Sequence, residues 1–195
     1  MEPEEKNEQQ TDRGAYEWMQ ALVCSVLAAV LVFTFAARVV GVSGGSMRST
    51  LQDGDMLLVM NSLLCSGFRQ GDIVIAAKAS FENGEPIVKR VIATEGQVVD
   101  IDFLSGTVFV DGTPLHEDYI NEPTYTAEGT EFPLTVPEGS VFVMGDNRNH
   151  SNDSRDARLG TVDTRYLIGR AVLVAFPGPD AATGERNYRR IGGIA

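Results

Sequence analysis

Cysteine and histidine are scarce in this chain, which limits the sites that it can build. Among 195 residues there are two cysteines, Cys24 and Cys65, with no CxxC pair and no disulfide framework. Both thiols are therefore expected to be free. The two histidines, His116 and His150, are far apart and belong to no HExxH pattern. The sequence thus predicts no zinc site and no other metal centre.

Clusters of basic residues are also missing. The chain has 16 Lys and Arg against 27 Asp and Glu, which gives a formal net charge of −11. A nucleic-acid-binding surface needs a basic stripe that neutralises phosphates. Nucleic acid is therefore not expected as a partner.

One long run contains no charge at all. The stretch WMQALVCSVLAAVLVFTFAA, residues 18–37, lies between Glu17 and Arg38. A helix rises 1.5 Å per residue, so a helix of this length covers about 30 Å, the hydrocarbon thickness of a bilayer. We therefore predict a single transmembrane helix at residues 18–37, with the lipid bilayer as a partner.

Two alternatives to a membrane span stay open. A buried core helix would usually be shorter and carry a polar stripe. A cleaved signal peptide is favoured by Ala36 and Ala37, although its apolar region would usually have only about 7 to 15 residues. The basic residues on the two sides of the run do not indicate an orientation. Residues 1–17 are polar and acidic, and we predict a disordered tail there.

The remainder, residues 38–195, has the pattern of a mostly β domain. Short runs rich in β-branched residues alternate with Gly, Asp and Asn. The predicted strands are MLLVM, DIVIAA, PIVKRVIA, QVVDID, TVFV, SVFVM and RAVLVAF. Asp111 and Gly112 after TVFV predict a hairpin. The stretch from Asn121 to Pro137 is a long excursion, typical of a functional loop or a small subdomain.

The run IVKRVIA carries two adjacent charges within an apolar strand. Alternation places Lys89 on one face and Arg90 on the other, each beside aliphatic residues. A charge in such surroundings has to be desolvated, paired or extended to solvent. From the strand alone we expect that one of the two reaches solvent.

Two polar motifs have ordinary interpretations when each is taken alone. VSGGSMRST is compatible with a linker, and Arg48 occupies the last position of the hydrolase pattern GxSxG. VFVMGDNRNHSNDSRD is compatible with a solvated turn, and it lacks the spacing of a calcium loop.

Taken in order, the apolar run, GGSMRST, GDIVIAA, KRVIATEGQ and GDNRNHSNDSR resemble the bacterial type I signal peptidases, in the form found in Gram-positive species. The resemblance covers nearly the whole folded part. It implies a nucleophile at Ser46 and a general base at Lys89. It also implies that Ser151 helps to position the lysine and that Asp153 and Arg155 form a structural ion pair. The turn implied beside the site consists of Gly145, Asp146, Asn147 and Arg148.

Elementary chemistry agrees with the implied dyad. A serine hydroxyl is a weak nucleophile until a base takes its proton, so Lys89 has to be neutral. Burial against apolar side chains lowers the pKa of a lysine, because it disfavours the charged form. Arg90 stays protonated and cannot be the base, so we hypothesise that it pairs with Asp146.

The surroundings of the implied nucleophile raise further expectations. The backbone N–H of Ser46 is the natural oxyanion donor, supported by Gly44 and Gly45. Some family members carry a serine where this chain has Gly44, so that hydroxyl donor is absent here. Ser43 is expected to point elsewhere and to matter little for turnover. Ser49 replaces the usual proline, which leaves the rigidity of the turn in doubt.

The resemblance implies a fold and an activity. The fold is a mostly β, antiparallel catalytic domain with a small β insertion at about residues 95–135, anchored by one N-terminal helix. The activity is cleavage of signal peptides from exported preproteins after small residues, typically Ala-X-Ala, outside the cell membrane and beside the secretion translocon. No metal or organic cofactor is implied, and no catalytic role is expected for His150.

Two rival functions stay open. The first is a self-cleaving Ser/Lys peptidase, which the apolar span and the acidic charge disfavour. The second is an anchored β domain that binds a partner without catalysis.

Overall fold

The computed structural model describes residues 3–180 and 183–194, and the chain divides into two compact units, Met1–Ala37 and Arg38–Ala195. The first unit is helical. α1 spans Pro3–Leu31 and continues as a π-helical turn at Val32–Ala36. Both cysteines of the chain are free.

Tyr16–Ala36 of the first unit is a 21-residue stretch with a mean hydropathy of 2.2, and its most apolar window has no part buried in protein. It is therefore long and apolar enough to cross a membrane. The sequence predicts a disordered tail at residues 1–17, but α1 already begins at Pro3. The difference has a physical reason, since the Glu, Gln and Lys residues of this segment favour a helix and extend one that the apolar run has nucleated.

The strands are β1 (Ala37–Gly41), β2 (Met56–Asn61), β3 (Ile73–Ala76), β4 (Ile87–Thr94), β5 (Val98–Asp102), β6 (Thr107–Val110), β7 (Thr113–Pro114), β8 (Leu134–Thr135), β9 (Ser140–Met144), β10 (Val162–Asp163), β11 (Leu167–Phe176) and β12 (Gly192–Gly193). Short 3₁₀ turns lie between them at Ser62–Leu64, Glu82–Gly84, Arg148–His150, Thr164–Tyr166 and Tyr188–Arg190.

All seven predicted strands are confirmed, as β2, β3, β4, β5, β6, β9 and β11. The predicted hairpin is confirmed as well. Val110 pairs with Thr113 across Asp111 and Gly112, whose φ angles are 52° and 75°. Positive φ at both central residues is what a type I′ turn requires, and Gly and Asp tolerate it best.

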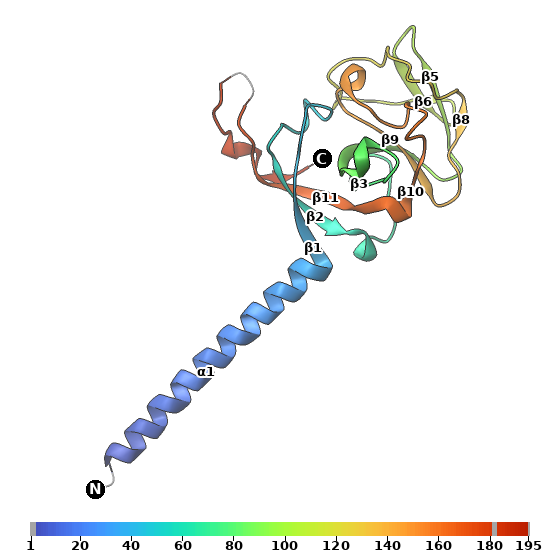
Figure 1. The fold of residues 1–195 in the computed structure, drawn as a ribbon. Coiled ribbons are helices and arrows are strands. Elements are labelled where there is room, and N and C mark those ends of the chain that lie inside the picture. The colour runs from blue at the N-terminus through green and yellow to red at the C-terminus, as the bar shows by residue number, and fades with distance from the viewer. Residues whose placement is uncertain (1–2, 181–182, 195) are drawn as a thin grey trace. The chain divides into compact units, whose positions relative to one another are not determined.

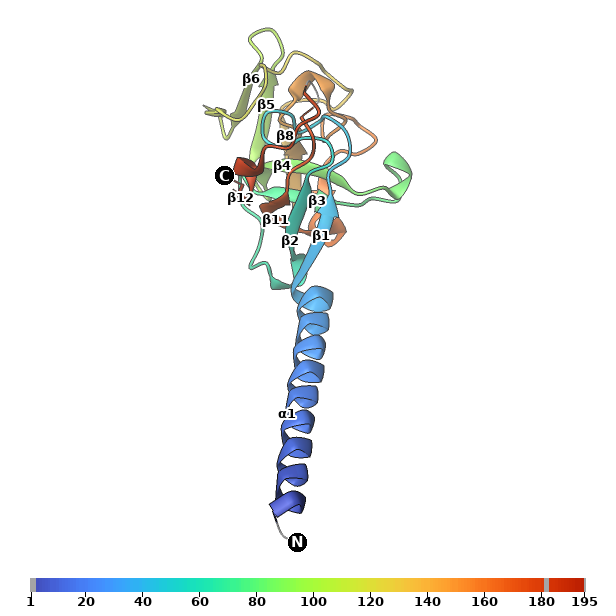
Figure 2. The same ribbon diagram turned by 90° about the vertical axis from the view of Figure 1, so that its left-hand side faces the viewer.

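The strands form two sheets. The eight-stranded sheet has the order β1-β2-β11-β3-β4-β9-β10, with β12 paired to β11, and the four-stranded sheet has the order β7-β6-β5-β8. The pairings of strands β2 to β12 are antiparallel. The smaller sheet lies on the far side of the domain from β1 and β2 (Figures 1 and 2). The predicted class, a mostly β and antiparallel domain, is therefore confirmed.

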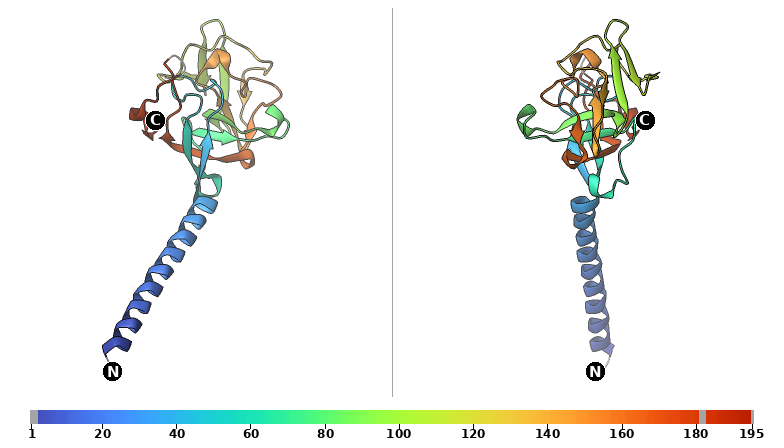
Figure 3. Two further views of the ribbon diagram at one scale, coloured as in Figure 1. Left: turned by 60° about the vertical axis from the view of Figure 1, so that its left-hand side comes forward. Right: turned by 90° about the vertical axis from the view of Figure 1, so that its right-hand side faces the viewer.

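Apolar side chains of both sheets form the core, and Figure 3 shows the curled strands from two further sides. One apolar cluster joins β2, β3 and β11 to Met47 and Leu51, which are each 1% exposed. Another packs the small sheet against Phe142 and Met144 of β9. Because Met47 follows Ser46 directly, the first cluster anchors the loop that carries that serine.

Candidate active site

A cavity of about 350 Å³ opens beside the loop after β1. Its wall brings together the segment after the apolar helix, the start of β4 and the turn after β9. The lining residues are Ser43, Gly44, Gly45, Ser46, Glu82, Glu85, Pro86, Ile87, Val88, Lys89, His150 and Asn152. Both residues of the implied dyad therefore face one cavity.

Ser46 sits at the start of a tight turn. The N–H groups of Thr50 and Leu51 donate to the carbonyl of Met47 at 3.1 and 2.8 Å. The side chains of Met47 and Leu51 point into the core, so apolar packing anchors the turn. The hydroxyl of Ser46 is left on the cavity side of the loop.

Lys89 reaches this hydroxyl from the sheet. β4 places Lys89 opposite Val74 of β3, in the interior of the eight-stranded sheet. The lysine is 4% exposed, and its Nζ donates a hydrogen bond to Ser46 Oγ at 2.7 Å. Arg90 is equally buried. The expectation that one of these charges extends to solvent is wrong, because both find partners inside the domain.

The environment of Lys89 favours its neutral form. Burial lowers the pKa of Lys89 from 10.5 to about 8, and it is the largest influence. The carboxylates of Asp153 and Glu82 act in the opposite direction, since they stabilise the ammonium. A useful fraction of this lysine is thus neutral near physiological pH.

Arg90 and Asp146 form a buried ion pair, as the sequence analysis hypothesised. Arg90 donates from Nε and Nη2 to the two oxygens of Asp146 at 2.9 and 2.8 Å. Thr50 Oγ1 donates to the same carboxylate at 2.5 Å. The pair therefore joins β4 to the end of the turn that starts at Ser46.

The segment after β9 holds the backbone of the serine loop. Asn147 donates from its backbone N to the carbonyl of Ser46 and from Nδ2 to the carbonyl of Gly45, each at 2.9 Å. A side chain at Gly145 would meet the Ser46 carbonyl at 2.5 Å, so only glycine permits this approach. These contacts fix the serine loop against the turn.

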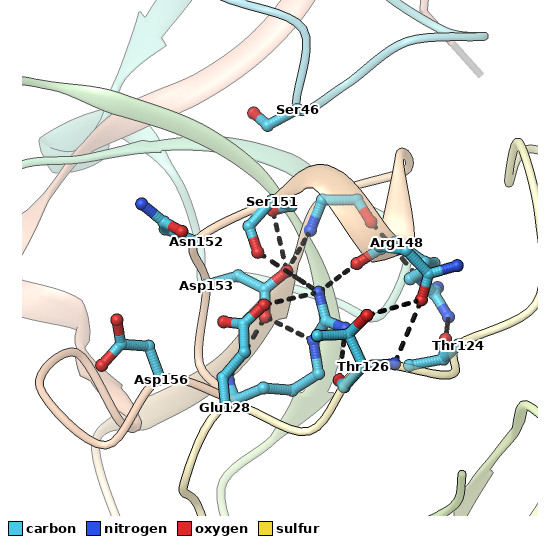
Figure 4. Close-up of polar contacts among 12 residues, drawn as sticks. Ser46, Thr124, Thr126, Glu128, Arg148, Ser151, Asn152, Asp153 and Asp156 are labelled. Atoms are coloured by element: carbon cyan, nitrogen blue, oxygen red, sulfur yellow. Dashed lines mark hydrogen bonds and ion pairs between the residues drawn. The ribbon is translucent and has the colours of Figure 1, made fainter. Parts of the chain in front are cut away.

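Figure 4 shows that Ser151, Asp153 and Glu128 lie close together in a polar cluster, to which Arg155 also belongs. Asp153 accepts from Arg155 Nε and Nη2, both at 2.8 Å, so the implied ion pair is present. Asp153 also accepts from Ser151 Oγ at 2.8 Å. Within residues 3–180 and 183–194, the hydroxyl of Ser151 bonds to this carboxylate and not to Lys89. Asp153 in turn influences Lys89 electrostatically, because its charge stabilises the ammonium form.

Arg148 lies in the same cluster and is fully buried. Its guanidinium donates to the Gly145 carbonyl at 3.1 Å, to Thr124 Oγ1 at 2.9 Å and to Glu117. Glu117 and Thr124 lie in the segment between β7 and β8. Arg148 therefore connects that segment to the turn beside the site.

A backbone N–H group can donate to the oxyanion only if it is not already hydrogen-bonded within the protein. The N–H of Gly44 donates to Asp53 Oδ1 at 2.8 Å, so Gly44 is a supporting residue. In the part of the chain that the structure describes, the N–H of Ser46 has no acceptor and is available. Ser43 also lines the cavity, and the expectation that its side chain points away from the oxyanion and matters little for turnover stays a prediction. Gly44 and Gly45 allow backbone angles that place Ser43 in the cavity wall.

Several residues of the site carry no signal in the sequence. Tyr119 covers Arg90 with its ring, 4.0 Å from the guanidinium carbon to the centroid, and its carbonyl accepts from Ser49 Oγ at 2.5 Å. Thr50 donates to Asp146, Glu82 lines the cavity, and Arg190 donates to the carbonyl of Thr50. Only Thr50 could have been suspected, from its place close after Ser46. The others reach the site through tertiary structure.

Known proteins resemble this chain over most of its length. Residues 15–176 match the family described as signal peptidase, peptidase S26. A signal peptidase I of Bacillus licheniformis is 36% identical over 170 residues, which cover 83% of this chain and 89% of the relative. Signal peptidase I T of Bacillus subtilis strain 168 is 35% identical over 185 residues, 89% of this chain and 91% of the relative.

Further matches come from another bacterial group and from a crystal structure. A probable signal peptidase I-1 of Synechocystis is 38% identical over 164 residues, 80% of this chain and 79% of the relative. A signal peptidase I structure from Enterococcus faecalis V583 is 33% identical and covers 54% of this chain and 97% of its own, with a TM-score of 0.44. By its family match and by these relatives, the chain belongs to the peptidase S26 family of signal peptidases.

Proposed function

We propose that this chain is a membrane-anchored signal peptidase I, a serine endopeptidase that removes signal peptides from exported preproteins. The observation that carries the proposal is the 2.7 Å contact between Lys89 Nζ and Ser46 Oγ in a cavity. Family membership supports the activity, and the apolar stretch Tyr16–Ala36 supports the anchor.

Ser46 is the nucleophile in this mechanism and Lys89 is the general base. The neutral amine of Lys89 takes the hydroxyl proton as Oγ attacks the scissile carbonyl. The developing oxyanion is met by the free N–H of Ser46. The lysine then returns the proton to the leaving amine, and a water molecule hydrolyses the acyl-enzyme by the same base.

The remaining site residues hold this pair in place. Asp146 and Arg90 fix the end of the serine turn, and Asn147 fixes its backbone. Asp153 and Arg155, with Ser151 between them and the cavity, stabilise the wall behind Lys89. The cavity is small, so we propose that it accepts short side chains before the cut, as in Ala-X-Ala.

The topology belongs to the same proposal. The N-terminal end of α1 is cytoplasmic, and the β domain lies outside the membrane, where signal peptides emerge from the secretion translocon. Apolar length and family support an anchor, and the direction follows from the need to meet exported substrates. Protease protection of epitope tags at each end of the chain would test the direction.

The decisive test uses the full chain purified in detergent with a preprotein that bears an Ala-X-Ala site. Wild type, Ser46→Ala and Lys89→Ala are compared by the masses of the products, and circular dichroism checks their folding. Ser66→Ala serves as the control, because Ser66 is exposed and is not among the residues that line the cavity. We expect one cut after the small residue in wild type and in the control, and none in the other two.

The two rivals predict different products. A self-cleaving peptidase would shorten its own chain without added preprotein. An anchored binding domain would leave the preprotein intact although wild type is folded. Cleavage that persists in Ser46→Ala or in Lys89→Ala would refute the proposed mechanism.

A further inference from the structure

The C-terminal segment, residues 177–194, lies beyond the part of the chain that matches the family, residues 15–176. It nevertheless returns to the domain, because β12 (Gly192–Gly193) pairs with β11. The pairing places the preceding turn, Tyr188–Arg190, beside the loop that follows Ser46. The C-terminal segment therefore contacts residues 50–55, which follow the serine turn.

Arg190 contacts three residues of that loop through four hydrogen bonds. Its Nη1 donates to Gln52 Oε1 at 3.0 Å, and its Nη2 donates to the carbonyl of Thr50 at 3.3 Å. Both Nη atoms also bind Asp55, at 2.9 and 2.6 Å. The planar guanidinium thus joins both ends of the short segment 50–55.

Asp55 is the buried centre of this arrangement. It has no exposed surface, and its carboxylate also accepts from the N–H of Gln52 at 2.8 Å and from that of Gly178 at 2.7 Å. A Cβ at Gly178 would meet the carbonyl of Asp53 at 2.2 Å, so the C-terminal segment packs directly on the loop. A buried carboxylate needs such partners, and Arg190 is the one that carries charge.

The serine turn depends on this segment. Thr50 and Leu51 close the turn by donating to the carbonyl of Met47, the residue after Ser46. Arg190 holds Thr50 from the other side, through the Thr50 carbonyl. A shift of residues 50–55 would therefore move the turn that carries Ser46 Oγ.

We propose that Arg190 is a positioning residue of the active site, which fixes segment 50–55 and thereby holds Ser46 Oγ toward Lys89 Nζ. This inference rests on the proposed function for its catalytic consequence. Arg190 touches no reacting atom and acts through Asp55 and Thr50. The C-terminal segment is accordingly part of the catalytic architecture.

The test compares Arg190→Ala and Arg190→Lys with wild type in the full chain in detergent. Arg189→Ala is the matched control, because it removes the same charge from an exposed neighbour. For Arg190→Ala we expect kcat to fall by about 10- to 100-fold, since a misplacement near 1 Å costs about that much, while KM changes little. Arg190→Lys should recover only a small part, because one compact ammonium with three donors cannot reach all four acceptor atoms.

Two readouts separate positioning from mere stability. Millimolar guanidinium should restore part of the kcat of Arg190→Ala and should leave Arg189→Ala unaffected. Hydrogen exchange of the amides of residues 46–55 should be faster in Arg190→Ala than in wild type or the control. Thermal unfolding measured in parallel gives the folded fraction of each variant.

The outcomes distinguish this inference from the proposed function. If wild type cuts no preprotein, the proposed function fails, and faster exchange at residues 46–55 still supports the positioning role. Wild-type kcat and wild-type exchange in Arg190→Ala would overturn the inference. A loss of kcat that only follows the unfolded fraction, without guanidinium rescue, would overturn it as well.

Discussion

Lys89 Nζ lies 2.7 Å from Ser46 Oγ, although 43 positions separate the two residues in the chain. The lysine comes from the centre of an antiparallel sheet, and the serine comes from a loop that is anchored in the core. Neither side chain needs histidine to complete the contact. The protonation state of one amine therefore controls the proposed chemistry.

The rate should follow the deprotonation of Lys89. Burial lowers the pKa of this lysine to about 8, and the base works only in its neutral form, which exists above that pKa. We expect kcat/KM to rise about tenfold per pH unit below the pKa and to level off above it. Initial rates on one preprotein between pH 5.5 and 9.5 measure this profile. A flat profile across that range would exclude Lys89 as the titrating base.

Glu82 should tune this profile. Its carboxylate lines the cavity and raises the pKa of Lys89 by stabilising the ammonium. Glu82→Gln keeps an oxygen for the hydrogen bond from Asn152, which is 2.8 Å long, and removes only the charge. We expect the rising limb of the profile to move to lower pH, so that activity near pH 7 increases. Glu85→Gln is the control, since Glu85 lines the same cavity without being a main influence on that pKa. An equal shift in both variants would contradict a specific role of Glu82.

The buried Lys89 should also lower the free energy of unfolding at neutral pH. The folded-state pKa is lowered from 10.5 to about 8, so the folded chain binds fewer protons than the unfolded chain between these values. The free energy of unfolding therefore rises with pH in that window, and the whole penalty is present below pH 8. Lys89→Met should stabilise the domain by up to about 3 kcal/mol at pH 6.5, at roughly 1.4 kcal/mol per unit. Loss of the contact with Ser46 offsets part of this gain.

Denaturant unfolding of wild type and Lys89→Met at pH 6.5 and at pH 9.5 measures the effect. The gain should be smaller at the higher pH, because Lys89 is then largely neutral in the folded chain. A gain of the same size at both values would show that packing, and not the buried charge, is responsible.

Strands and turns could be predicted from the sequence because their signals are local. The β-branched runs predict seven strands, and Asp111 with Gly112 predicts the hairpin, since positive φ selects these residues. The dyad came from the order of four motifs that resemble a known family. Neither residue could have been assigned from its own motif, because GGS is also a linker and a strand lysine can extend to solvent.

Apart from the dyad and the pairing of Arg90 with Asp146, contacts between distant segments could not be predicted from the sequence. Arg90 is buried against Asp146 and under the ring of Tyr119, and the approach of Tyr119 has no signal in the sequence. Arg190 binds Asp55 across more than half of the chain, and nothing near either residue indicates the partner. The position of Ser43 in the cavity wall depends on backbone angles that a glycine pair leaves open.

Arg90 and Asp146 should be strongly coupled. Both side chains are buried, and removal of one leaves the other charge without a partner. Arg90→Met or Asp146→Asn alone should each cost about 3 to 5 kcal/mol of unfolding free energy, and the double variant should cost less than their sum.

The control for this cycle is the pair Arg165 and Asp163. Its geometry is similar, but the arginine side chain is 84% exposed, so solvent should keep the coupling below about 1 kcal/mol. Urea unfolding of the four variants in each cycle gives both coupling energies. Strictly additive losses at Arg90 and Asp146 would show that the buried pair does not act as a unit.

Ser49 should not tolerate the proline that type I signal peptidases usually carry at this position. Its φ angle is 83°, whereas a proline ring fixes φ near −65°. Its hydroxyl also donates to the carbonyl of Tyr119, and proline would remove this tie to the segment between β7 and β8. Ser49→Pro should therefore cost about 1 to 3 kcal/mol and lower activity, because the strained turn begins at Ser46.

Ser49→Gly separates the two causes. Glycine accepts the positive φ and removes only the hydroxyl, so its stability should stay within about 1 kcal/mol of wild type. Thermal unfolding and preprotein cleavage of both variants check the prediction. If Ser49→Pro were instead more stable than wild type, the turn would have to adopt negative φ at this residue, and the hydrogen bond to Tyr119 could not hold the serine loop as described.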